Sequence, residues 1–220
     1  DFERAIQASS KVLAIRGRVV PSTNMKVRLA AEHEDGSITQ GESNISRAPM
    51  PIRRIYLEPA MCHPTKGALE AIREAHAIVL GPGSLYTSII PNLLVDGMVD
   101  AIVQSVALKI YVCNVMTQSR ETNGYRASDH VQALIAHSNP GLIQLCLVNT
   151  ESVPTTLLEK YREEGAFPVE NVTAPDPKQL ALTPTTVAGF LGKPAPKEVG
   201  AGWEPSNAGP ALSRLLKRYD

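Results

Sequence analysis

Residues 77–95, with the sequence AIVLGPGSLYTSIIPNLLV, decide the fold of this chain. The four apolar residues at the start predict a strand, and GPGS directly after them predicts a tight turn. From Ser84 onward the apolar and hydroxyl residues follow a helical pattern, which we expect to run to residue 105 with a break at Pro91. The stretch therefore predicts a strand, a glycine turn and a helix in direct succession.

The start of this predicted helix has the features of an anion site. The first backbone N–H groups of a helix lack internal partners, and the helix dipole favours negative charge there. Gly81 and Gly83 let the backbone bend and approach a ligand closely. Ser84, Thr87 and Ser88 add hydroxyl groups. We therefore expect this turn to bind the phosphate of a phosphorylated metabolite.

The same turn also has a simpler interpretation. A serine that follows a glycine turn can serve only as the cap of a helix. The turn is not a Walker loop, because no Lys-Ser or Lys-Thr pair follows the glycines, and it is not a GxGxxG fingerprint. The local sequence leaves phosphate binding and simple capping both open.

Strands and helices alternate along most of the remaining chain. A β-hairpin is predicted over residues 26–41, with its turn at Glu34, Asp35 and Gly36. Apolar runs predict strands at residues 52–57, 109–115 and 143–149, and helical periodicity predicts helices at residues 64–75, 128–137 and 155–164. Such alternation implies βαβ crossovers. We therefore predict an α/β fold with a mostly parallel sheet, helices on both faces and a hairpin insertion.

Ligands of parallel sheets bind at the carboxyl ends of the strands. This rule selects three loops, at residues 81–88, 114–129 and 150–154. The second loop begins NVMTQSRETNGY and brings amide, hydroxyl, guanidinium and carboxylate groups to one strand end. Long polar loops are often only solvated, so a binding role for this loop is one of two interpretations.

Asp129 and His130 come nearest to a catalytic pair. Asp129 lies at a predicted helix start, where a carboxylate stabilises the helix for structural reasons. Neighbouring residues on a helix point apart, so His130 as a general base is the weaker of two interpretations. We assign no catalytic residue, and no CxxC or HxxxH spacing predicts a metal site.

The composition limits the partners of the protein. Its 220 residues are enough for one large core, and 22 basic residues balance 22 acidic ones, so no global field attracts nucleic acid. Pro91, Asn92 and Asp96 interrupt the longest apolar run, which is therefore too short to span a bilayer. Three cysteines, an odd number, are typical of reduced packing residues in a cytosolic protein. We expect no nucleic-acid binding and no membrane insertion.

The two ends of the chain differ from its middle. Residues 2–15 have a helical pattern that ends near Gly17, and Asp1 is not a start methionine, so we expect a piece of a longer protein. Residues 173–220 are rich in proline and glycine, with one short helix expected at residues 210–219. We assign residues 1–172 to the α/β domain and residues 173–220 to a looser tail of the same domain.

Several segments, taken in order, resemble a known family. They are IRGRVVPST, GES, IYLEP, IVLGPGSLYTSIIPNLLV, KIYVCNVMTQSRETNGYRASDH and KYREEGAFPV. Over about residues 2–172 the sequence resembles the YvcK family of gluconeogenesis factors, which is similar to the CofD 2-phospho-L-lactate transferases. The blocks GPGSLYTSIIPN and VCNVMTQ…ET are the most specific parts of this resemblance.

The resemblance implies a Rossmann-like, three-layer α/β fold in a cytoplasmic bacterial protein. It implies a regulator without catalysis that binds nucleotide sugars of the UDP-N-acetylglucosamine type. Such regulators influence cell shape, envelope synthesis and growth on gluconeogenic carbon sources. The alternative is a CofD-like transferase that moves phospholactate from a guanosine diphosphate carrier to a deazaflavin and uses Mg²⁺. A homo-oligomer is compatible with both.

The resemblance also implies which residues contact the ligand. The glycine turn and helix start would line the phosphate or sugar pocket, and the loop after residue 113 would form its neighbouring wall. A tyrosine in KYREEG would complete the site. The implied residues are Gly81, Pro82, Gly83, Ser84, Tyr86, Thr87, Ser88, Asn114, Thr117, Gln118, Glu121 and Tyr161.

Two motifs of the family differ in this chain. The GGGTG phosphate loop and the acidic DDGG motif with which the family begins are not in the sequence, so we expect only half of the nucleotide cradle. The family's Arg-His-Asp-Pro segment is matched here by Gly202-Trp203-Glu204-Pro205. Glycine cannot provide the bidentate grip of arginine on phosphate, so we expect a weakened affinity for nucleotide sugars.

Overall fold

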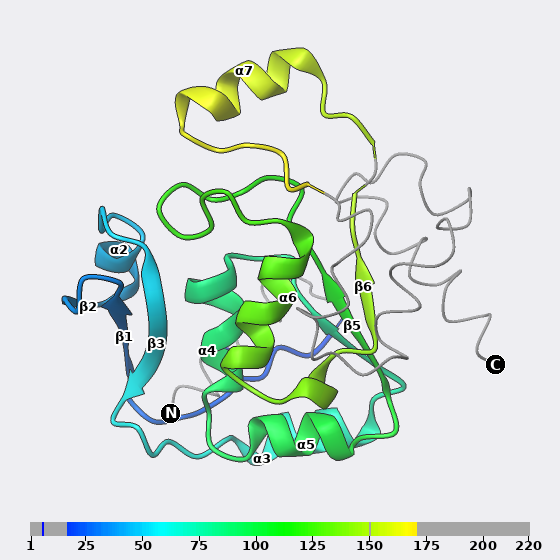
Figure 1. Cartoon of the computed structure of the whole chain (residues 1–220). Coiled ribbons are helices and arrows are strands. Elements are labelled where there is room, and N and C mark those ends of the chain that lie inside the picture. Colours follow the sequence, from blue (N-terminus) through cyan, green and yellow to red (C-terminus); the bar gives the residue numbers. More distant parts are fainter. Residues whose placement is uncertain (1–5, 7–16, 150, 171–220) are drawn as a thin grey trace.

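The computed structural model describes residue 6, residues 17–149 and residues 151–170 (Figure 1). Apart from residue 6, the helix predicted before Gly17 lies outside these residues, as do the proline-rich tail and the last short helix. Between Gly17 and residue 170, strands and helices alternate as the sequence predicts, and the α/β fold is confirmed.

The parallel sheet forms as predicted. Its strands are β4 (Ala77–Leu80), β5 (Leu108–Val112) and β6 (Leu145–Leu147), in the order β4-β5-β6. Leu80 pairs with Tyr111, and Val112 pairs with Leu147, so the three strands end near one edge. β5 and β6 end earlier than predicted, which leaves more of each following segment free to form the strand-end loops.

A second, antiparallel sheet contains the predicted hairpin. Its strands are β1 (Arg28–His33), β2 (Ile38–Gln40) and β3 (Ile52–Glu58), in the order β2-β1-β3. The sequence predicted β3 but did not separate it from the parallel series. The only helix between β2 and β3 is α2 (Glu42–Ile45), whose four residues are too few for a parallel crossover, so β3 returns antiparallel to β1.

The pairing of β1 with β3 contains an irregularity at Arg53. Glu32 pairs with Arg54, whereas the next residue, His33, pairs with Ile52, so one residue of β3 is left over. Such a bulge changes which face a side chain occupies. As a result Ile52 and Ile55, three positions apart, are both buried in the core.

The helix after β4 is broken at a different place from the predicted one. A π-helical turn, η1 (Leu85–Ile89), continues into α4 (Ile90–Leu93), and α5 (Met98–Gln104) follows. Pro91 lies in the first turn of α4, where a missing N–H group is tolerated, so it does not break the helix. The chain turns at Gly97 instead, whose φ of +75° suits glycine.

The other predicted helices are confirmed. They are α3 (Lys66–Glu74), α6 (Ala127–Ala136) and α7 (Thr155–Glu163), with a short 3₁₀ turn, η2 (Pro140–Leu142). The hydroxyl of Thr65 accepts the Ala68 N–H at 3.1 Å and so begins α3, within the predicted range of residues 64–75. Gly165, with φ of +74°, follows α7 and ends it.

One core joins the two sheets. Figure 1 shows α4 and α6 between the antiparallel sheet and the parallel sheet, with α3 and α5 together at one end. Ile55 of β3, Tyr111 of β5 and Leu134 of α6 belong to the same cluster of buried side chains. Among the described residues no single helix is long and apolar enough to cross a membrane; only the bent pair Leu85–Leu93 and Met98–Gln104 passes that test when joined.

Candidate functional site

The turn after β4 depends on glycine at its first position. Gly81 has φ of +88°, and a Cβ there would lie 2.9 Å from the carbonyl oxygen of Val112, at the end of β5. No side chain fits in that space, and an L residue would also be strained in this conformation. Gly81 therefore lets the turn lie directly over the carboxyl end of the neighbouring strand.

Backbone donors of the turn have no hydrogen-bond partner among the described residues. η1 and α4 form one continuous helix, Leu85–Leu93, and the N–H groups of Ser88 and Ile89 return to the carbonyl of Ser84. In the described part of the chain, the N–H groups of Gly83, Ser84 and Leu85 make no hydrogen bond. The Ser84 hydroxyl does not cap the helix. Ser84 is thus the N-cap residue by position but makes no capping hydrogen bond, and the donors that an anion would use are present.

Asn114 connects the second strand-end loop to the turn. Its Nδ2 donates to the Gly83 carbonyl at 3.0 Å, a contact between the end of β5 and the turn after β4. Ser84 and Asn114 are both partly exposed, and Pro82 and Ser88 are exposed. These four residues and the two glycines, Gly81 and Gly83, are thus at least partly exposed to solvent.

Glu121 is buried between η1 and the loop after β5. Its carboxylate is 3% exposed and accepts from Ser46 Oγ at 2.8 Å, from Thr87 Oγ1 at 3.2 Å and from Gln118 Nε2 at 3.3 Å. Burial raises the pKa of this carboxyl, while the hydroxyls of Ser46 and Thr87 and the Tyr86 backbone N–H act in the opposite direction. Three predicted site residues thus meet, but they bond to one another.

Thr117 has a supporting position. It is buried, its N–H donates to the Phe167 carbonyl at 2.6 Å, and its hydroxyl accepts the Phe167 N–H at 2.9 Å. Val169 N–H donates to the Val115 carbonyl at 2.9 Å beside them. Thr117 therefore fastens the segment after α7 to the loop after β5, and its polar atoms are already used.

Tyr86 points into the core. Its side chain is 3% exposed, and its hydroxyl lies 2.7 Å from that of Tyr125. The rings of Tyr125 and His137 approach it edge-on, with centroids 6.3 Å and 5.8 Å away, and His130 lies 5.5 Å from Tyr125. Burial raises the pKa of Tyr86 far above its ordinary value. This aromatic cluster belongs to the packing of the protein.

His130 and Asp129 have the structural roles that the sequence favours. Asp129 Oδ2 accepts the Arg126 N–H at 2.7 Å and so stabilises the start of α6. His130 is fully buried, and its Nδ1 lies 3.0 Å from the Arg126 carbonyl. Burial lowers the pKa of His130. A ring without access to solvent cannot serve as the general base for a ligand at the surface.

Tyr161 lies on α7, far along the chain from the turn after β4. Its side chain is 38% exposed, and Figure 1 shows α7 apart from η1 and α4. A contact of Tyr161 with a ligand stays a prediction. No group of three His, Cys, Asp or Glu side chains within the described ranges could hold a metal ion, so these residues do not by themselves fit Mg²⁺.

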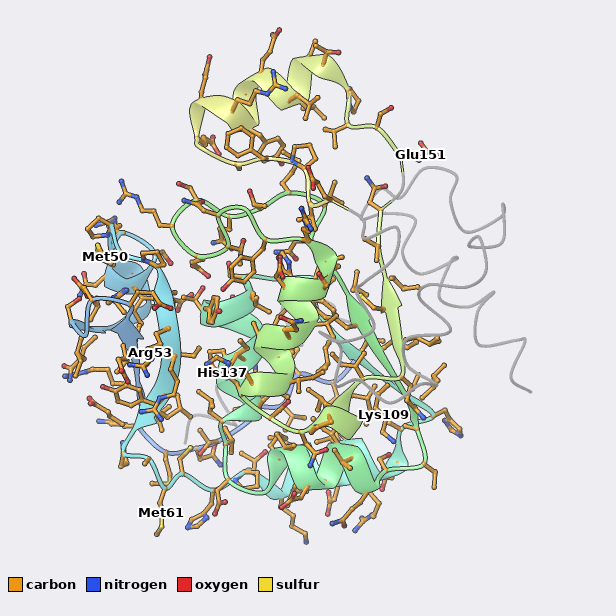
Figure 2. All side chains as sticks on the ribbon, viewed as in Figure 1. Met50, Arg53, Met61, Lys109, His137 and Glu151 are labelled. Atoms are coloured by element: carbon orange, nitrogen blue, oxygen red, sulfur yellow. The ribbon has the colours of Figure 1, made fainter. Side chains whose placement is uncertain are left out.

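Sequence reasoning missed two residues that support the site. Ser46 reaches Glu121 from 75 positions away, and His137 accepts the Ile55 N–H at 3.2 Å from 82 positions away. Figure 2 shows His137 on the side of α6 that faces the antiparallel sheet. No local signal marks either contact. A depression of about 650 Å³ was also not predicted; it is lined by Arg28, Ile38, Gln40, Gly41 and Asn44.

Comparison with known proteins gives a consistent set of relatives. Residues 1–185 match the family model described as 2-phospho-L-lactate transferase CofD. The chain is 51% identical over 169 residues to the gluconeogenesis factor of Halalkalibacterium halodurans, covering 77% of this chain and 52% of that protein. It is 46% identical over 170 residues to the gluconeogenesis factor of Bacillus subtilis, covering 77% and 54%.

Solved structures agree with the sequence comparison. A crystal structure of a UPF0052 family member from Bacillus halodurans has a TM-score of 0.74 and 51% identity, covering 77% of this chain and 55% of that one. A second structure from the same organism has a TM-score of 0.76 and 46% identity, covering 87% and 58%. The chain spans about half the length of the curated relatives it matches.

Proposed function

This chain belongs to the CofD family, and its likeness to the gluconeogenesis factors within it is the premise from which we propose a function. We propose that the protein binds a nucleotide sugar of the UDP-N-acetylglucosamine type and acts as a cytoplasmic regulator. The regulated processes would be carbon metabolism, cell shape and envelope synthesis. The names of the relatives support the carbon-metabolism part of this proposal.

The observation that carries the proposal is the set of open donors at the turn after β4. The N–H groups of Gly83, Ser84 and Leu85 have no partner within the described residues, and they begin a continuous helix. Helix starts of this kind bind phosphate through backbone N–H groups and the helix dipole. Asn114 lies beside them at the next strand end, where it can contact a group attached to the phosphate.

A second candidate function is the transfer of a phospholactyl group from a guanosine diphosphate carrier to a deazaflavin. The description of the matching family model supports it. That reaction uses Mg²⁺, and the described residues do not gather three acidic or histidine ligands. We therefore rank it second and derive no catalytic step from this chain.

Calorimetric titration of the protein with UDP-N-acetylglucosamine, GDP and a deazaflavin separates the two functions. The first proposal expects heat of binding with the nucleotide sugar and no turnover. Phospholactate transfer without any nucleotide-sugar binding would favour the transferase and contradict the first proposal.

Ser84→Asp tests the assignment of the turn. The new carboxylate would occupy the position expected for phosphate and repel it, so we expect affinity for the nucleotide sugar to fall at least tenfold, about 1.4 kcal/mol. Ser43→Asp adds the same charge at an exposed position of α2 and serves as the control. A folded Ser84→Asp protein with unchanged affinity would remove the turn from the site.

A further inference from the structure

Glu121 is a buried carboxylate beside the start of the η1 helix. Within the described residues no Lys or Arg forms an ion pair with it, and its three side-chain partners, Ser46, Thr87 and Gln118, are neutral donors. An ionised carboxylate is an acceptor only, and this set of donors suits that form. In the described part of the chain, this acidic group therefore has no cation that balances its charge.

The position of this carboxylate matters for an anion at the turn. Tyr86 and Thr87 are the second and third residues of η1. The Tyr86 N–H and the Thr87 hydroxyl both donate to the Glu121 carboxylate. The N–H groups proposed to bind phosphate come from Gly83, Ser84 and Leu85, directly before them. One helix start thus faces Glu121, and of the donors directly before it Gly83 and Ser84 are partly exposed while Leu85 is buried.

We propose that Glu121 is a positioning and specificity residue of the turn after β4. It holds η1 against Ser46, which directly follows α2, and against Gln118 of the loop after β5. Its charge would lie behind the bound phosphate. A like charge in a partly desolvated region repels a dianion about twice as strongly as a monoanion. The site therefore favours phosphates that carry one charge each, as in a sugar diphosphate diester, over a terminal phosphate that carries two.

This inference rests on the proposed function and deepens it by naming a ligand class. It also explains why a carboxylate is present in a site for an anion. A neutral Gln or Asn at position 121 could accept the same hydroxyl donors and would not oppose the ligand. Retaining the charge costs some affinity for every phosphate, and in return it discriminates between the diphosphate diester and the free nucleotide diphosphate.

The test compares two ligands on two proteins. UDP and UDP-N-acetylglucosamine share the nucleotide and both phosphates, but only UDP has a doubly charged terminal phosphate near neutral pH. Calorimetry on the wild type should show tighter binding of the nucleotide sugar. In Glu121→Gln, which keeps the shape and removes the charge, we expect UDP to gain at least threefold relative to the nucleotide sugar. Glu121→Asp, which retains the charge, should keep the wild-type preference.

Each outcome decides a separate claim. An unchanged ratio in a folded Glu121→Gln protein overturns the role of Glu121 and leaves the proposed function intact. Absence of binding by both ligands to the wild type overturns both. If Glu121→Gln does not fold, the inference is tested on the wild type by measuring ligand affinity as a function of pH. Sulfate is then the doubly charged ligand, because it stays a dianion in mild acid.

In this test on the wild type, the affinity for sulfate relative to UDP-N-acetylglucosamine should rise as the pH is lowered. Protonation of Glu121 removes the negative charge that Glu121→Gln would remove. Glu42 and Tyr86 are the other titratable groups that act on this carboxyl; the raised pKa of Tyr86 keeps its hydroxyl neutral in that range. A ratio that does not change with pH would contradict the inference.

Discussion

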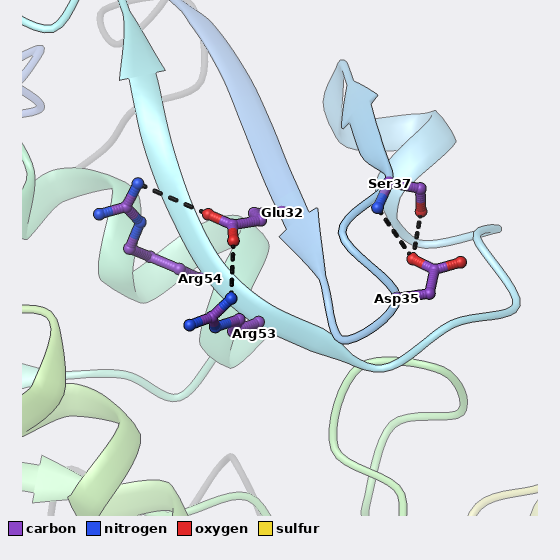
Figure 3. Close-up of polar contacts among 5 residues, drawn as sticks. All are labelled: Glu32, Asp35, Ser37, Arg53 and Arg54. Carbon is purple, nitrogen blue, oxygen red and sulfur yellow. Dashed lines mark hydrogen bonds and ion pairs between the residues drawn. The ribbon is translucent and has the colours of Figure 1, made fainter.

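The two sheets of the molecule use their strand ends differently. In the parallel sheet, β4 and β5 end in loops that meet where Asn114 donates to the Gly83 carbonyl, and backbone donors stay open there. In the antiparallel sheet, the turn between β1 and β2 is closed on itself, since Asp35 accepts from both the N–H and the hydroxyl of Ser37 (Figure 3). The strand ends of the parallel sheet therefore leave backbone donors without partners among the described residues, whereas the hairpin turn satisfies its own.

Two polar contacts connect the two parts of the molecule across the core. Ser46, next to α2, donates to Glu121, and the Ile55 N–H of β3 donates to His137 Nε2 at the end of α6. Both contacts satisfy groups that are buried or partly buried, where an unpaired donor or acceptor is costly. The comparison predicts that changes at the strand end of the parallel sheet affect stability more than matched changes in the hairpin.

Gly81→Ala should have the largest effect on stability. Gly81 and Gly36 both have positive φ, +88° and +81°, but a Cβ at Gly81 would lie 2.9 Å from the Val112 carbonyl oxygen, whereas nothing lies within 4 Å of a Cβ at Gly36. We expect Gly81→Ala to lower the free energy of unfolding by about 3 kcal/mol or more, and Gly36→Ala by about 1 kcal/mol. Urea denaturation of both variants measures the difference. Equal losses would show that the strand-end turn is not tightly packed.

Glu121→Ala should have the next largest effect. It leaves the Ser46, Thr87 and Gln118 donors without their acceptor in a buried region, so we expect a loss of about 2 kcal/mol or more in the free energy of unfolding. Glu32→Ala is the matched change in the antiparallel sheet. Glu32 pairs with Arg53 and Arg54 at 3.1 Å and 3.6 Å, and both arginines are exposed, so its loss should stay below about 1 kcal/mol (Figure 3). A similar cost for the two variants would remove Glu121 from its anchoring role.

Acid should weaken the contact between the sheets by a smaller amount. Burial lowers the pKa of His137, as does nearby Arg54, while the Ala133 carbonyl at 2.7 Å from Nδ1 opposes the change. The unfolded chain then binds the proton more readily, so stability is present above the ordinary pKa of about 6.5 and is lost as the pH falls through the lower folded value. Protonation of Nε2 also removes the acceptor of the Ile55 N–H.

His137→Gln should therefore reduce the loss of stability between neutral and mildly acidic pH, measured by thermal unfolding at a series of pH values. His130 also has a pKa lowered by burial, so a part of the loss will remain. His76→Gln, at an exposed position, is the control, and its pH dependence should follow that of the wild type. An identical pH dependence of His137→Gln and wild type would contradict this account of the contact.

Local sequence predicted most of what depends on neighbouring residues. The glycine turn after β4, the start of α3 at Thr65 and the end of α7 at Gly165 each follow from residue types within a few positions. The separation of β3 into its own sheet could not be predicted in this way, because it depends on the length of α2 and on the bulge at Arg53.

The sequence predicted which strand-end loops lie together, but not which of their side chains are buried. The rule that ligands bind at strand ends selected two loops that meet in the structure, where Asn114 donates to the Gly83 carbonyl. A binding role for these loops stays a prediction. The rule does not say which polar side chains turn inward. Thr87 and Gln118 bond to Glu121, and Thr117 bonds to Phe167, because the core on that side contains buried donors and acceptors that need partners.

The measurement that tests the central claim most directly is a titration of the ¹⁵N-labelled protein with UDP-N-acetylglucosamine, followed by NMR of the backbone amides. Binding at the open donors should shift the amide resonances of Gly83, Ser84 and Leu85 most strongly and leave that of Gly36 in the hairpin turn unchanged. Saturable shifts confined to the depression around Gly41, with none at Gly83–Leu85, would contradict the assignment of the phosphate to the turn after β4.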